Sequence, residues 1–378
     1  MKINANTELL KKALAAAAAF CSTRATMPIL ANVRLGADFG TLTISATNLT
    51  AGATIGMPCA VEKSGVTTVG ASSLLNIISM LETEFVNIET DKKGTNLLIT
   101  CPGYAGTLPT LDAAEFPLIK GEMPETKFIV PTAQFVAALN AVTPCASKDE
   151  SRPVLTGIEF IVTPTNIQLA ATDGYRLTID VIQVKTGVAD KTTLVVPAQN
   201  LNLIAKLAKE AGEEMWIGFS ATEFCAAITA GDGSGQTALV GSAVYEPKFP
   251  DYRAIIPKTQ TTKVAISGAL LKKATQLAML ANNNKKVSIV EFDFGADELT
   301  LSAMSDAGAA DAKVATQMEG EPITIKFNGA YMLDMISGMP NDTLMFEMTQ
   351  PTRPAAIYSF TTGKEAHLAI LMPMHPGR

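Results

Sequence analysis

The segment Ala170-Ala171-Thr172-Asp173-Gly174-Tyr175-Arg176-Leu177 determines how the rest of the chain is interpreted. Apolar and polar residues alternate before it, over residues 167–169, and after it, over residues 177–179. An Asp-Gly pair between two alternating runs is typical of a tight β-hairpin, because glycine adopts the positive φ angles that such turns need. The segment therefore predicts two antiparallel strands joined at Asp173-Gly174.

Two degraded copies of this segment occur elsewhere in the chain. Ile44-Ser45-Ala46-Thr47-Asn48 lies 125 positions earlier (172 − 47), and Leu301-Ser302-Ala303-Met304-Ser305 lies 132 positions later (304 − 172). Solenoid repeats have periods of about 20 to 50 residues, which is far shorter than this spacing. The pattern indicates three copies of one whole domain, and a chain of 378 residues is long enough for three domains of ordinary size.

The order of predicted elements supports this threefold division. Each third is expected to begin with a strand followed by an amphipathic helix. The strand and helix cover residues 2–5 and 7–20 in the first third, 128–131 and 132–142 in the second, and 264–267 and 270–280 in the third. Thr7 and Ser267 are the expected N-caps of the first and third of these helices. A strand pair follows in each third, over residues 29–35 and 41–45, 155–162 and 167–171, and 287–294 and 298–302.

A second strand and helix complete each third, over residues 67–69 and 72–81, 193–197 and 201–208, and 323–327 and 331–337. Two helices with several antiparallel strands indicate an α+β domain whose helices lie on one face of the sheet. The expected domains are residues 1–123, 124–253 and 254–378.

Composition narrows the possible functions. The formal net charge is −6, so the molecule as a whole should repel a polyanion, and a nucleic-acid role would need a local basic surface or another means of attachment. The five cysteines are scattered and odd in number, which favours reduced thiols in a cytoplasmic protein. Only His367 and His375 are available for histidine chemistry, and no apolar run reaches the length of a membrane span.

An export signal is the alternative interpretation of the N-terminus. Lys11-Lys12, an alanine-rich run and Cys21 resemble a lipoprotein signal peptide. Glu8 lies upstream of the run, however, and alanine is a helix former more than a hydrophobe, so we favour a folded helix.

Three separated motifs resemble the bacterial DNA polymerase III β sliding clamp family. They are residues 171–177, Phe249-Pro250-Asp251-Tyr252-Arg253 and Leu371-Met372-Pro373-Met374, and their order and spacing match the family over the whole chain. The resemblance implies three similar clamp domains per subunit and two subunits closed head to tail into a six-domain ring. It implies a processivity factor without catalytic activity that encircles duplex DNA without sequence specificity, and it implies no cofactor and no metal.

A ring also accounts for the acidic net charge. Phosphate contacts release counterions, so a protein held by them alone loses affinity steeply with salt. A closed ring leaves DNA only by opening or by sliding off an end, so weak attraction along its inner face suffices. The resemblance implies that the DNA-facing positions are Arg24, Lys148, Arg152, Lys206, Lys285 and Lys286, whereas an ordinary solvated helix face is the alternative for any one of them.

The resemblance also implies an apolar cleft that receives short peptide motifs of the replicative polymerase, the clamp loader and repair proteins. Its expected walls are Leu155, Thr172, Gly174, Tyr175, Arg176, Leu177, Pro250, Ile255, Tyr331, Ile370, Met372, Pro373 and Met374. Methionines suit varied apolar partners, although residues 370–372 could equally form a core strand. Tyr175 stands where the family motif often has histidine, and residues 375–378 run past its usual end.

The resemblance implies that Leu108 and Leu280 lie in the contact between the two subunits, although each could equally be an ordinary core leucine. The loop Gly231-Asp232-Gly233-Ser234-Gly235 resembles a phosphate-binding loop, but no Gly-Lys-Ser/Thr follows it, so a hairpin is the preferred interpretation. An enzyme of unknown chemistry on a triplicated scaffold and a clamp relative serving another partner are the remaining alternatives.

Overall fold

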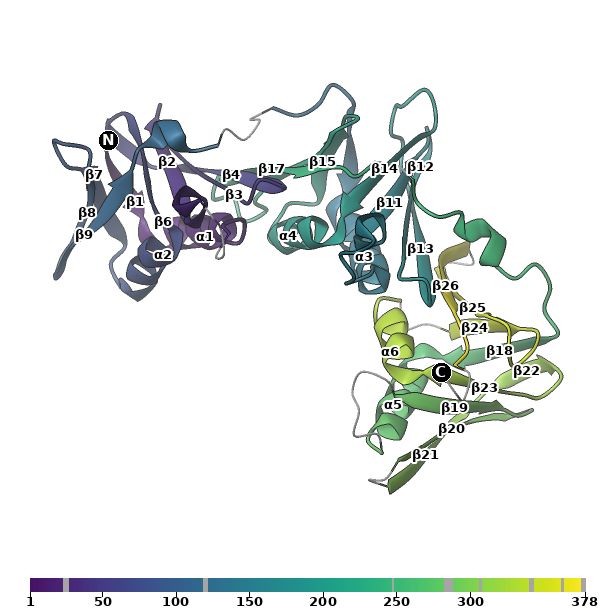
Figure 1. Ribbon diagram of the computed structural model, residues 1–378. Helices are drawn as coiled ribbons and strands as arrows, with labels where there is room; N and C mark the ends of the chain where they lie inside the picture. Colours follow the sequence, from purple (N-terminus) through teal and green to yellow (C-terminus); the bar gives the residue numbers. More distant parts are fainter. Residues whose placement is uncertain are drawn as a thin grey trace. The chain divides into compact units, whose positions relative to one another are not determined.

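The computed structural model describes residues 1–22, 27–117, 122–246, 248–281, 288–305, 308–339, 343–361 and 364–374 (Figure 1). The pairings in its three large sheets are antiparallel, and six α-helices occur in the described residues, two in each predicted third. The predicted α+β class is therefore confirmed. Contacts group the chain into two compact units, Met1–Val136 with Gln199–Val244, and Ala137–Ala198 with Tyr245–Arg378.

The first unit is built on one sheet with the strand order β10-β15-β16-β17-β4-β3-β2-β6-β9-β8-β7-β1-β5. Its strands are β1 (Lys2–Asn6), β2 (Asn32–Asp38), β3 (Thr41–Thr47), β4 (Ala51–Pro58), β5 (Ala60–Lys63), β6 (Gly65–Gly70), β7 (Phe85–Thr90), β8 (Asn96–Cys101), β9 (Tyr104–Leu111), β10 (Lys127–Pro131), β15 (Glu214–Phe219), β16 (Glu223–Thr229) and β17 (Thr237–Ala243). Its helices are α1 (Thr7–Ala18), α2 (Ala71–Met80) and α4 (Ala198–Ala208), with 3-10 turns η1 (Pro28–Ala31) and η2 (Ala113–Glu115).

The apolar spacing of α1 explains how the helix covers this sheet. Leu10, Leu14 and Ala17 recur at helical spacing and are buried, and α1 contacts α2, β3 and β4. Lys11 and Lys12 lie on its outer side, where Lys12 Nζ pairs with Asp232 Oδ2 at 3.3 Å. The predicted Gly231–Gly235 turn joins β16 to β17, as the hairpin interpretation requires.

The second unit contains a nine-stranded sheet with the order β14-β11-β12-β13-β26-β25-β24-β18-β22 and a four-stranded sheet with the order β21-β20-β19-β23. The strands are β11 (Gly157–Val162), β12 (Asn166–Thr172), β13 (Arg176–Gln183), β14 (Thr192–Pro197), β18 (Thr262–Ser267), β19 (Ile289–Phe294), β20 (Glu298–Ser305), β21 (Gly308–Ala315), β22 (Gln317–Gly320), β23 (Ile323–Asn328), β24 (Thr343–Met348), β25 (Ala355–Thr361) and β26 (Lys364–Leu371). The helices are α5 (Gly268–Met279) and α6 (Gly329–Ser337), with 3-10 turns η3 (Thr143–Cys145), η4 (Pro153–Thr156) and η5 (Tyr252–Ile255), while α3 (Thr132–Val142) spans the division between the units.

The repeat predicted from the sequence is present as three hairpins at corresponding places. The pairs β3–β4, β12–β13 and β20–β21 each contain one copy of the signature segment. Two sheets also continue from one third of the chain into the next, because β4 pairs with β17 and β13 pairs with β26. Hydrogen bonding across the predicted boundaries explains why the central third is divided between the two compact units.

Three local predictions were wrong. The N-cap of α1 is Asn6, whose Oδ1 accepts from Leu9 N at 3.1 Å, and not Thr7, which is already the first helical residue. Residues 29–30 and 155–156 belong to η1 and η4 and not to strands, because Pro28 and Pro153 favour the start of a helical turn. Each of these two 3-10 turns precedes the first strand of a hairpin. Their first residues, Pro28 and Pro153, are 125 positions apart (153 − 28), which is further evidence for the repeat.

Candidate functional site

The turn between β12 and β13 is held by its own side chains. Thr172 Oγ1 donates to Arg176 O at 2.7 Å and accepts from Gly174 N at 3.1 Å. Asp173 Oδ1 accepts from Tyr175 N at 2.9 Å and from Arg176 N at 3.0 Å. Gly174 has φ of +90°, a conformation that glycine adopts without steric cost. This geometry confirms the predicted hairpin and fixes the direction of the Arg176 side chain.

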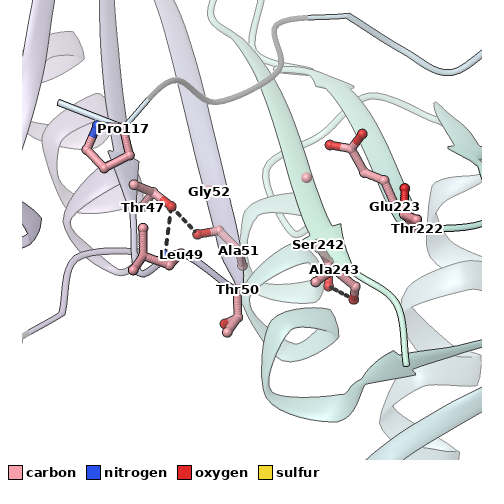
Figure 2. Close-up of a pocket in the computed structure, with 11 residues that line it drawn as sticks. Thr47, Leu49, Thr50, Ala51, Gly52, Pro117, Thr222, Glu223, Ser242 and Ala243 are labelled. Carbon is pink, nitrogen blue, oxygen red and sulfur yellow. Dashed lines mark hydrogen bonds between the residues drawn. The ribbon is translucent and has the colours of Figure 1, made fainter. Parts of the chain in front are cut away.

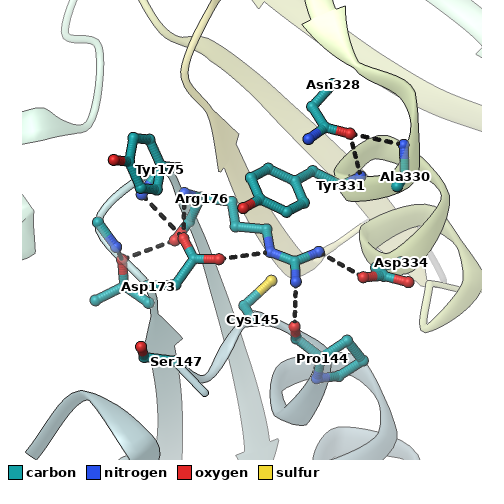
Figure 3. Close-up of polar contacts among 12 residues, drawn as sticks. Pro144, Cys145, Ser147, Asp173, Tyr175, Arg176, Asn328, Ala330, Tyr331 and Asp334 are labelled. Atoms are coloured by element: carbon teal, nitrogen blue, oxygen red, sulfur yellow. Dashed lines mark hydrogen bonds and ion pairs between the residues drawn. The ribbon is translucent and has the colours of Figure 1, made fainter. Parts of the chain in front are cut away.

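Arg176 is the centre of the site, with a side chain only 6% exposed (Figure 3). Its Nε lies 3.0 Å from Asp173 Oδ2, its Nη1 lies 2.8 Å from Asp334 Oδ2, and its Nη2 donates to Pro144 O at 2.6 Å. Its Cζ lies 4.2 Å from the ring centroid of Tyr331. The planar guanidinium suits this set of partners because it presents several donors in fixed directions together with a face that stacks on an aromatic ring.

Helix α6 supplies two of these partners because of how it begins. Asn328 caps the helix, its Oδ1 accepting from Ala330 N at 3.0 Å and from Tyr331 N at 3.4 Å. Tyr331 and Asp334 are three residues apart and so lie on one side of the helix, where Figure 3 shows both directed toward Arg176. The guanidinium therefore joins the β12–β13 turn, the η3 segment and α6.

Cys145 lies beneath this cluster and is a structural thiol. Its Sγ is 3.0 Å from Thr178 Oγ1, and burial raises the pKa of the thiol to about 11. A thiol with so high a pKa is almost fully protonated at neutral pH and is a poor nucleophile.

A buried cluster behind the hairpin explains the Phe249–Arg253 motif. Tyr252 packs against Leu177 and Ile370, and its hydroxyl donates to Glu159 Oε2 at 2.9 Å and accepts from Gln168 Nε2 at 2.8 Å. Burial raises the pKa of the Glu159 carboxyl and of the Tyr252 hydroxyl above their ordinary values. The motif thus anchors the segment before β18 to the β12–β13 hairpin.

The predicted cleft residues divide into two groups in the structure. Those that are buried are Leu155, Thr172, Arg176, Leu177 and Ile370. Those at least partly accessible are Gly174, Tyr175, Pro250, Ile255, Tyr331, Met372, Pro373 and Met374. Met372 N donates to Tyr175 O at 3.0 Å, so the end of β26 lies beside the hairpin turn. Tyr175 is 63% exposed and is the more exposed of the two tyrosines in the set.

The predicted DNA-facing residues are only partly described. Arg24, Lys285 and Lys286 lie outside the described residues, as does the His375–Arg378 extension. Lys148 and Arg152 are exposed in the segment between η3 and η4, and Lys206 is exposed in the last turn of α4.

The two predicted dimer leucines differ in accessibility. Leu108 on β9 is half-buried, whereas Leu280, the C-cap of α5, is 78% exposed. The exposed Leu270 and Leu277 lie on the same helix with a spacing of seven residues, which places them on one face. This apolar stripe was missed at the sequence level, although the spacing was visible there.

The partners of Arg176 were also missed. Asp334 is 158 residues away in the sequence and the third partner is the backbone carbonyl of Pro144, so no local motif identifies either contact. Asp173 is the one partner that lies within the signature segment, and it forms a buried ion pair with Arg176 as part of this network.

Solved structures of similar fold identify the class of protein. The DNA polymerase sliding clamp of Bacillus subtilis aligns with a TM-score of 0.91 and 22% identity, covering 100% of this chain and 99% of that one. The sliding clamp of Bartonella birtlesii bound to griselimycin aligns with a TM-score of 0.89 and 25% identity over 100% of both chains. The fold is therefore that of a DNA sliding clamp.

Sequence comparisons give the family. The models described as the N-terminal, central and C-terminal domains of the DNA polymerase III beta subunit match residues 1–120, 129–251 and 253–375. The chain belongs to the DNA polymerase III beta subunit family. The beta sliding clamp of Streptomyces coelicolor is 28% identical over 381 residues, covering 99% of both chains, and the beta sliding clamp homolog GriR of Streptomyces muensis is 28% identical over 360 residues, covering 94% of this chain and 93% of its own.

Membership of this family makes the chain an accessory processivity factor of DNA replication without catalytic activity of its own, as the sequence predicted. No helix in the described parts of the chain is long and apolar enough to cross a membrane.

Proposed function

We propose that two copies of this chain close head to tail into a ring of six domains that encircles duplex DNA and slides along it in the cytoplasm. The observation that carries the proposal is the succession of three clamp domains along one chain, matched at residues 1–120, 129–251 and 253–375. We assign the domains to residues 1–123, 124–253 and 254–378. The net charge of −6 also supports topological attachment, because a molecule that repels DNA as a whole is poorly suited to ionic binding alone.

The DNA-facing role goes to Arg24, Lys148, Arg152, Lys206, Lys285 and Lys286. Among these, Lys148, Arg152 and Lys206 are exposed, and none of the three takes part in an ion pair within the described residues of the chain. By contrast Lys11 and Lys12 on α1 pair with Glu8 and Asp232. Unpaired surface lysines and arginines are the ones able to attract phosphates weakly without fixing the position of the ring.

The subunit contact joins the first domain of one chain to the third domain of the other. Leu108 and Leu280 remain the assigned contacts, and we add Leu270 and Leu277 because their side chains continue the apolar stripe on α5. Apolar residues exposed together on one helix face are typical of a surface that another chain covers.

The partner-binding site is the surface around the β12–β13 turn. Tyr175, Ile255, Met372, Pro373 and Met374 offer accessible apolar area for a short peptide motif of the replicative polymerase, the clamp loader or a repair protein. The buried members of the set, Arg176 above all, hold this surface in shape and do not contact the peptide directly.

A primer-extension assay tests this function. With the polymerase and clamp loader of the same organism, the full chain should lengthen the products made in a single binding event. Deleting residues 372–378 should abolish this stimulation while the dimer persists in analytical ultracentrifugation. Unchanged product length with the full chain would refute the function, whereas unchanged stimulation by the deletion variant would refute the cleft assignment alone.

A further inference from the structure

Strand β10 is the last strand at one end of the first unit's sheet, and only one of its two edges is paired. Its neighbour is β15, and no other strand in the described parts of the chain pairs with it. The first strands of the other two thirds are paired on both edges, because β1 lies between β7 and β5 and β18 lies between β24 and β22. The unpaired side of β10, which we call the β10 edge, therefore lacks the short strand that covers this edge in the other two thirds.

The three first strands align on a shared lysine. Each reads lysine, apolar, variable, apolar, variable before the first helix of its third, and the lysines are Lys2, Lys127 and Lys263. The second and fourth residues of this pattern are buried in all three strands. The first and third residues are half-buried in β1 and β18 but exposed in β10, where they are Lys127 and Ile129. These two side chains are therefore the ones that the absent strand leaves uncovered.

The segment that corresponds to β5 and β22 forms no strand. Residues 184–191 connect β13 to β14, as β5 lies between β4 and β6 and β22 lies between β21 and β23. Thr186 is buried, and its N and Oγ1 donate to Pro164 O at 3.2 Å and to Thr163 O at 2.6 Å. The segment is therefore held by the β11–β12 turn and is not part of a sheet.

The β10 edge presents a row of backbone hydrogen-bonding groups. On the side of β15, Thr132 N donates to Glu213 O at 2.9 Å, just beyond the end of β10. Positions that bond to one neighbour alternate along an antiparallel strand, so Lys127 and Ile129 direct their N–H and C=O groups away from β15. Nothing in the described residues pairs with these four groups. Such a row is the template onto which another strand adds.

The middle of the same sheet differs from this end because its polar groups have partners. The first and central thirds meet there where Ala51 on β4 pairs with Ser242 on β17, and a cavity of about 300 Å³ lies beside the pairing (Figure 2). Thr47 Oγ1, which lines the cavity, donates to Ala51 O at 2.9 Å. Ser242 Oγ, which also lines it, donates to Ala243 O at 3.0 Å. These hydroxyls are engaged within the chain, whereas the backbone groups of the β10 edge are not.

Two large apolar side chains lie beside the β10 edge. Ile129 pairs directly with Trp216 on β15, and the two residues are 38% and 43% exposed. The corresponding pair in the first third is polar, and Asn4 Nδ2 donates to Asn87 Oδ1 at 2.8 Å. An added strand would place a side chain against Ile129 and would shield Trp216 from water.

The two covering strands show which chemistry fits the edge. Both are antiparallel to the strand they cover, and both contain an apolar residue followed directly by glutamate. On β5, Glu62 Oε2 lies 2.6 Å from Lys2 Nζ, and on β22, Glu319 is the register partner of Lys263. Lys127 takes part in no ion pair with the described residues of the chain. A carboxylate on an added strand would supply the missing partner.

We propose that the β10 edge binds an extended segment of a partner protein as an added antiparallel strand. Read from its N-terminus, the segment has an apolar residue opposite Ile129, a second apolar residue, and a glutamate or aspartate opposite Lys127. Hydrogen bonds to the backbone of β10 supply the affinity, and the side chains at Ile129 and Lys127 fix the register. The site uses no residue of the surface around the β12–β13 turn, so it stands or fails independently of the proposed function.

The emission of Trp216 tests the proposal, because it is the single tryptophan of the chain and lies beside the β10 edge. The probe is the hexapeptide Thr-Ile-Val-Glu-Thr-Ser, which lacks aromatic residues and is titrated into the full chain up to millimolar concentration. Binding should shift the emission to shorter wavelength, because the added strand excludes water around Ile129 and the indole ring.

Methylating single peptide nitrogens of the probe distinguishes strand addition from other modes of binding. The probe residues opposite Ile129 and Lys127 donate to β10, so N-methylation of the isoleucine or the glutamate should weaken binding at least about tenfold. N-methylation of the valine between them, whose N–H points away from β10, is the matched control and should have little effect.

Variants of the chain locate the site. Ile129→Pro removes one donor of the β10 edge and should abolish the shift, while the pairing with β15 persists because proline is tolerated where a strand N–H faces solvent. Lys127→Glu should weaken the glutamate probe about fivefold and favour a probe with lysine at that position. Lys93→Glu on an exposed turn is the matched control, and Tyr175→Ala alters the partner cleft, so both should leave binding unchanged.

Each contradictory outcome is distinct. Absence of a shift with the parent probe, or equal effects of N-methylation at all three positions, overturns the proposal. An unchanged shift in folded Ile129→Pro overturns it, as does loss of binding in Tyr175→Ala, because the probe would then occupy the partner cleft. If Ile129→Pro without peptide sediments as a smaller species than the unmodified chain, the edge pairs with a second copy, which also overturns it. If Ile129→Pro does not fold, the methylation series and the charge exchange at Lys127 decide.

Discussion

Arg176 carries a charge that is almost completely removed from water, and its surroundings replace the lost hydration. The Asp173 side chain is only 13% exposed and Pro144 is half-buried, whereas the Asp334 side chain is about half-exposed. Solvent screens the Asp334 contact more strongly, so the pair with Asp173 and the carbonyl bond contribute most. The network therefore depends on one side chain that no other residue type can replace in full.

Replacing Arg176 should consequently destabilise the second unit. Removing one member of a buried ion pair leaves the other uncompensated, so Arg176→Ala should lower the free energy of unfolding by about 3 kcal/mol. Arg176→Lys keeps the charge but loses the forked geometry and should lie in between. Urea unfolding measures both, with exposed Arg353→Ala as the control. Equal stability of Arg176→Ala and the control would contradict the structural role.

Glu159 should make the stability of the protein depend on pH. Burial raises the pKa of its carboxyl above the ordinary value of 4.5, so the folded state holds the proton more tightly than the unfolded state. The associated stabilisation is complete below pH 4.5 and is lost as the pH rises through the raised pKa of the folded state.

The variant Glu159→Gln removes this dependence while it keeps an acceptor for Tyr252. Relative to the unmodified chain, its free energy of unfolding should therefore increase as the pH is raised from 4 to 7. The exposed Glu125→Gln serves as the control in the same urea titrations. A difference that stays constant with pH, or that reverses sign, would rule out the raised pKa.

For single residues, the sequence predicts local conformation better than contacts with residues far away in the chain. The Asp173-Gly174 turn follows from residue types alone, since few residues tolerate the required φ. The cap of α1 was displaced by one residue because Asn6 and Thr7 are both good caps, and only backbone geometry distinguishes them. The contact between Arg176 and Asp334 depends on tertiary structure and leaves no sequence pattern.

The continuation of sheets from one third of the chain into the next is the main feature at the scale of elements. Strand β17 pairs with β4, and β26 pairs with β13, so each pairing crosses a predicted domain boundary. The alternation of apolar and polar residues predicted where the strands lie. It did not predict which strand pairs with which, because alternation specifies the buried face of a strand and not the neighbouring strand. The three-copy pattern therefore indicated the modules but not how hydrogen bonds join them.

The exposed leucines of helix α5 give a prediction about the stability of the dimer. Leu277 and Leu280 are exposed in the single chain, so changing both to lysine should cost little stability in the subunit itself. In the proposed dimer the same change would bury charge at the subunit contact, which is strongly unfavourable, and should raise the dimer dissociation constant by at least about 100-fold. Sedimentation velocity measures the shift.

The control for α5 is Met80→Lys, which alters an apolar residue that is also exposed, at the end of α2. It should leave the dimer intact. Dimerisation of the Leu277→Lys/Leu280→Lys variant at the concentration of the unmodified chain would show that the stripe on α5 serves another purpose.

The acidic net charge of the whole molecule is compatible with the proposed function only if the protein is held on DNA by encircling it. A chain with 36 acidic and 30 basic residues lacks the overall attraction that purely ionic DNA binding requires. Once closed, a ring needs no tight contact, and loose contact permits sliding. Topological attachment also predicts weak dependence on salt, in contrast to the steep loss that accompanies release of many counterions.

The central claim is tested most directly by loading the protein onto nicked circular DNA with its clamp loader and then cutting the circle once. Gel filtration before and after cutting measures the protein that remains on the DNA. We expect retention on the circle at high salt and loss within the time needed to slide off the new ends. Equal retention on circular and linear DNA, or loss from both at the same salt concentration, would contradict encirclement.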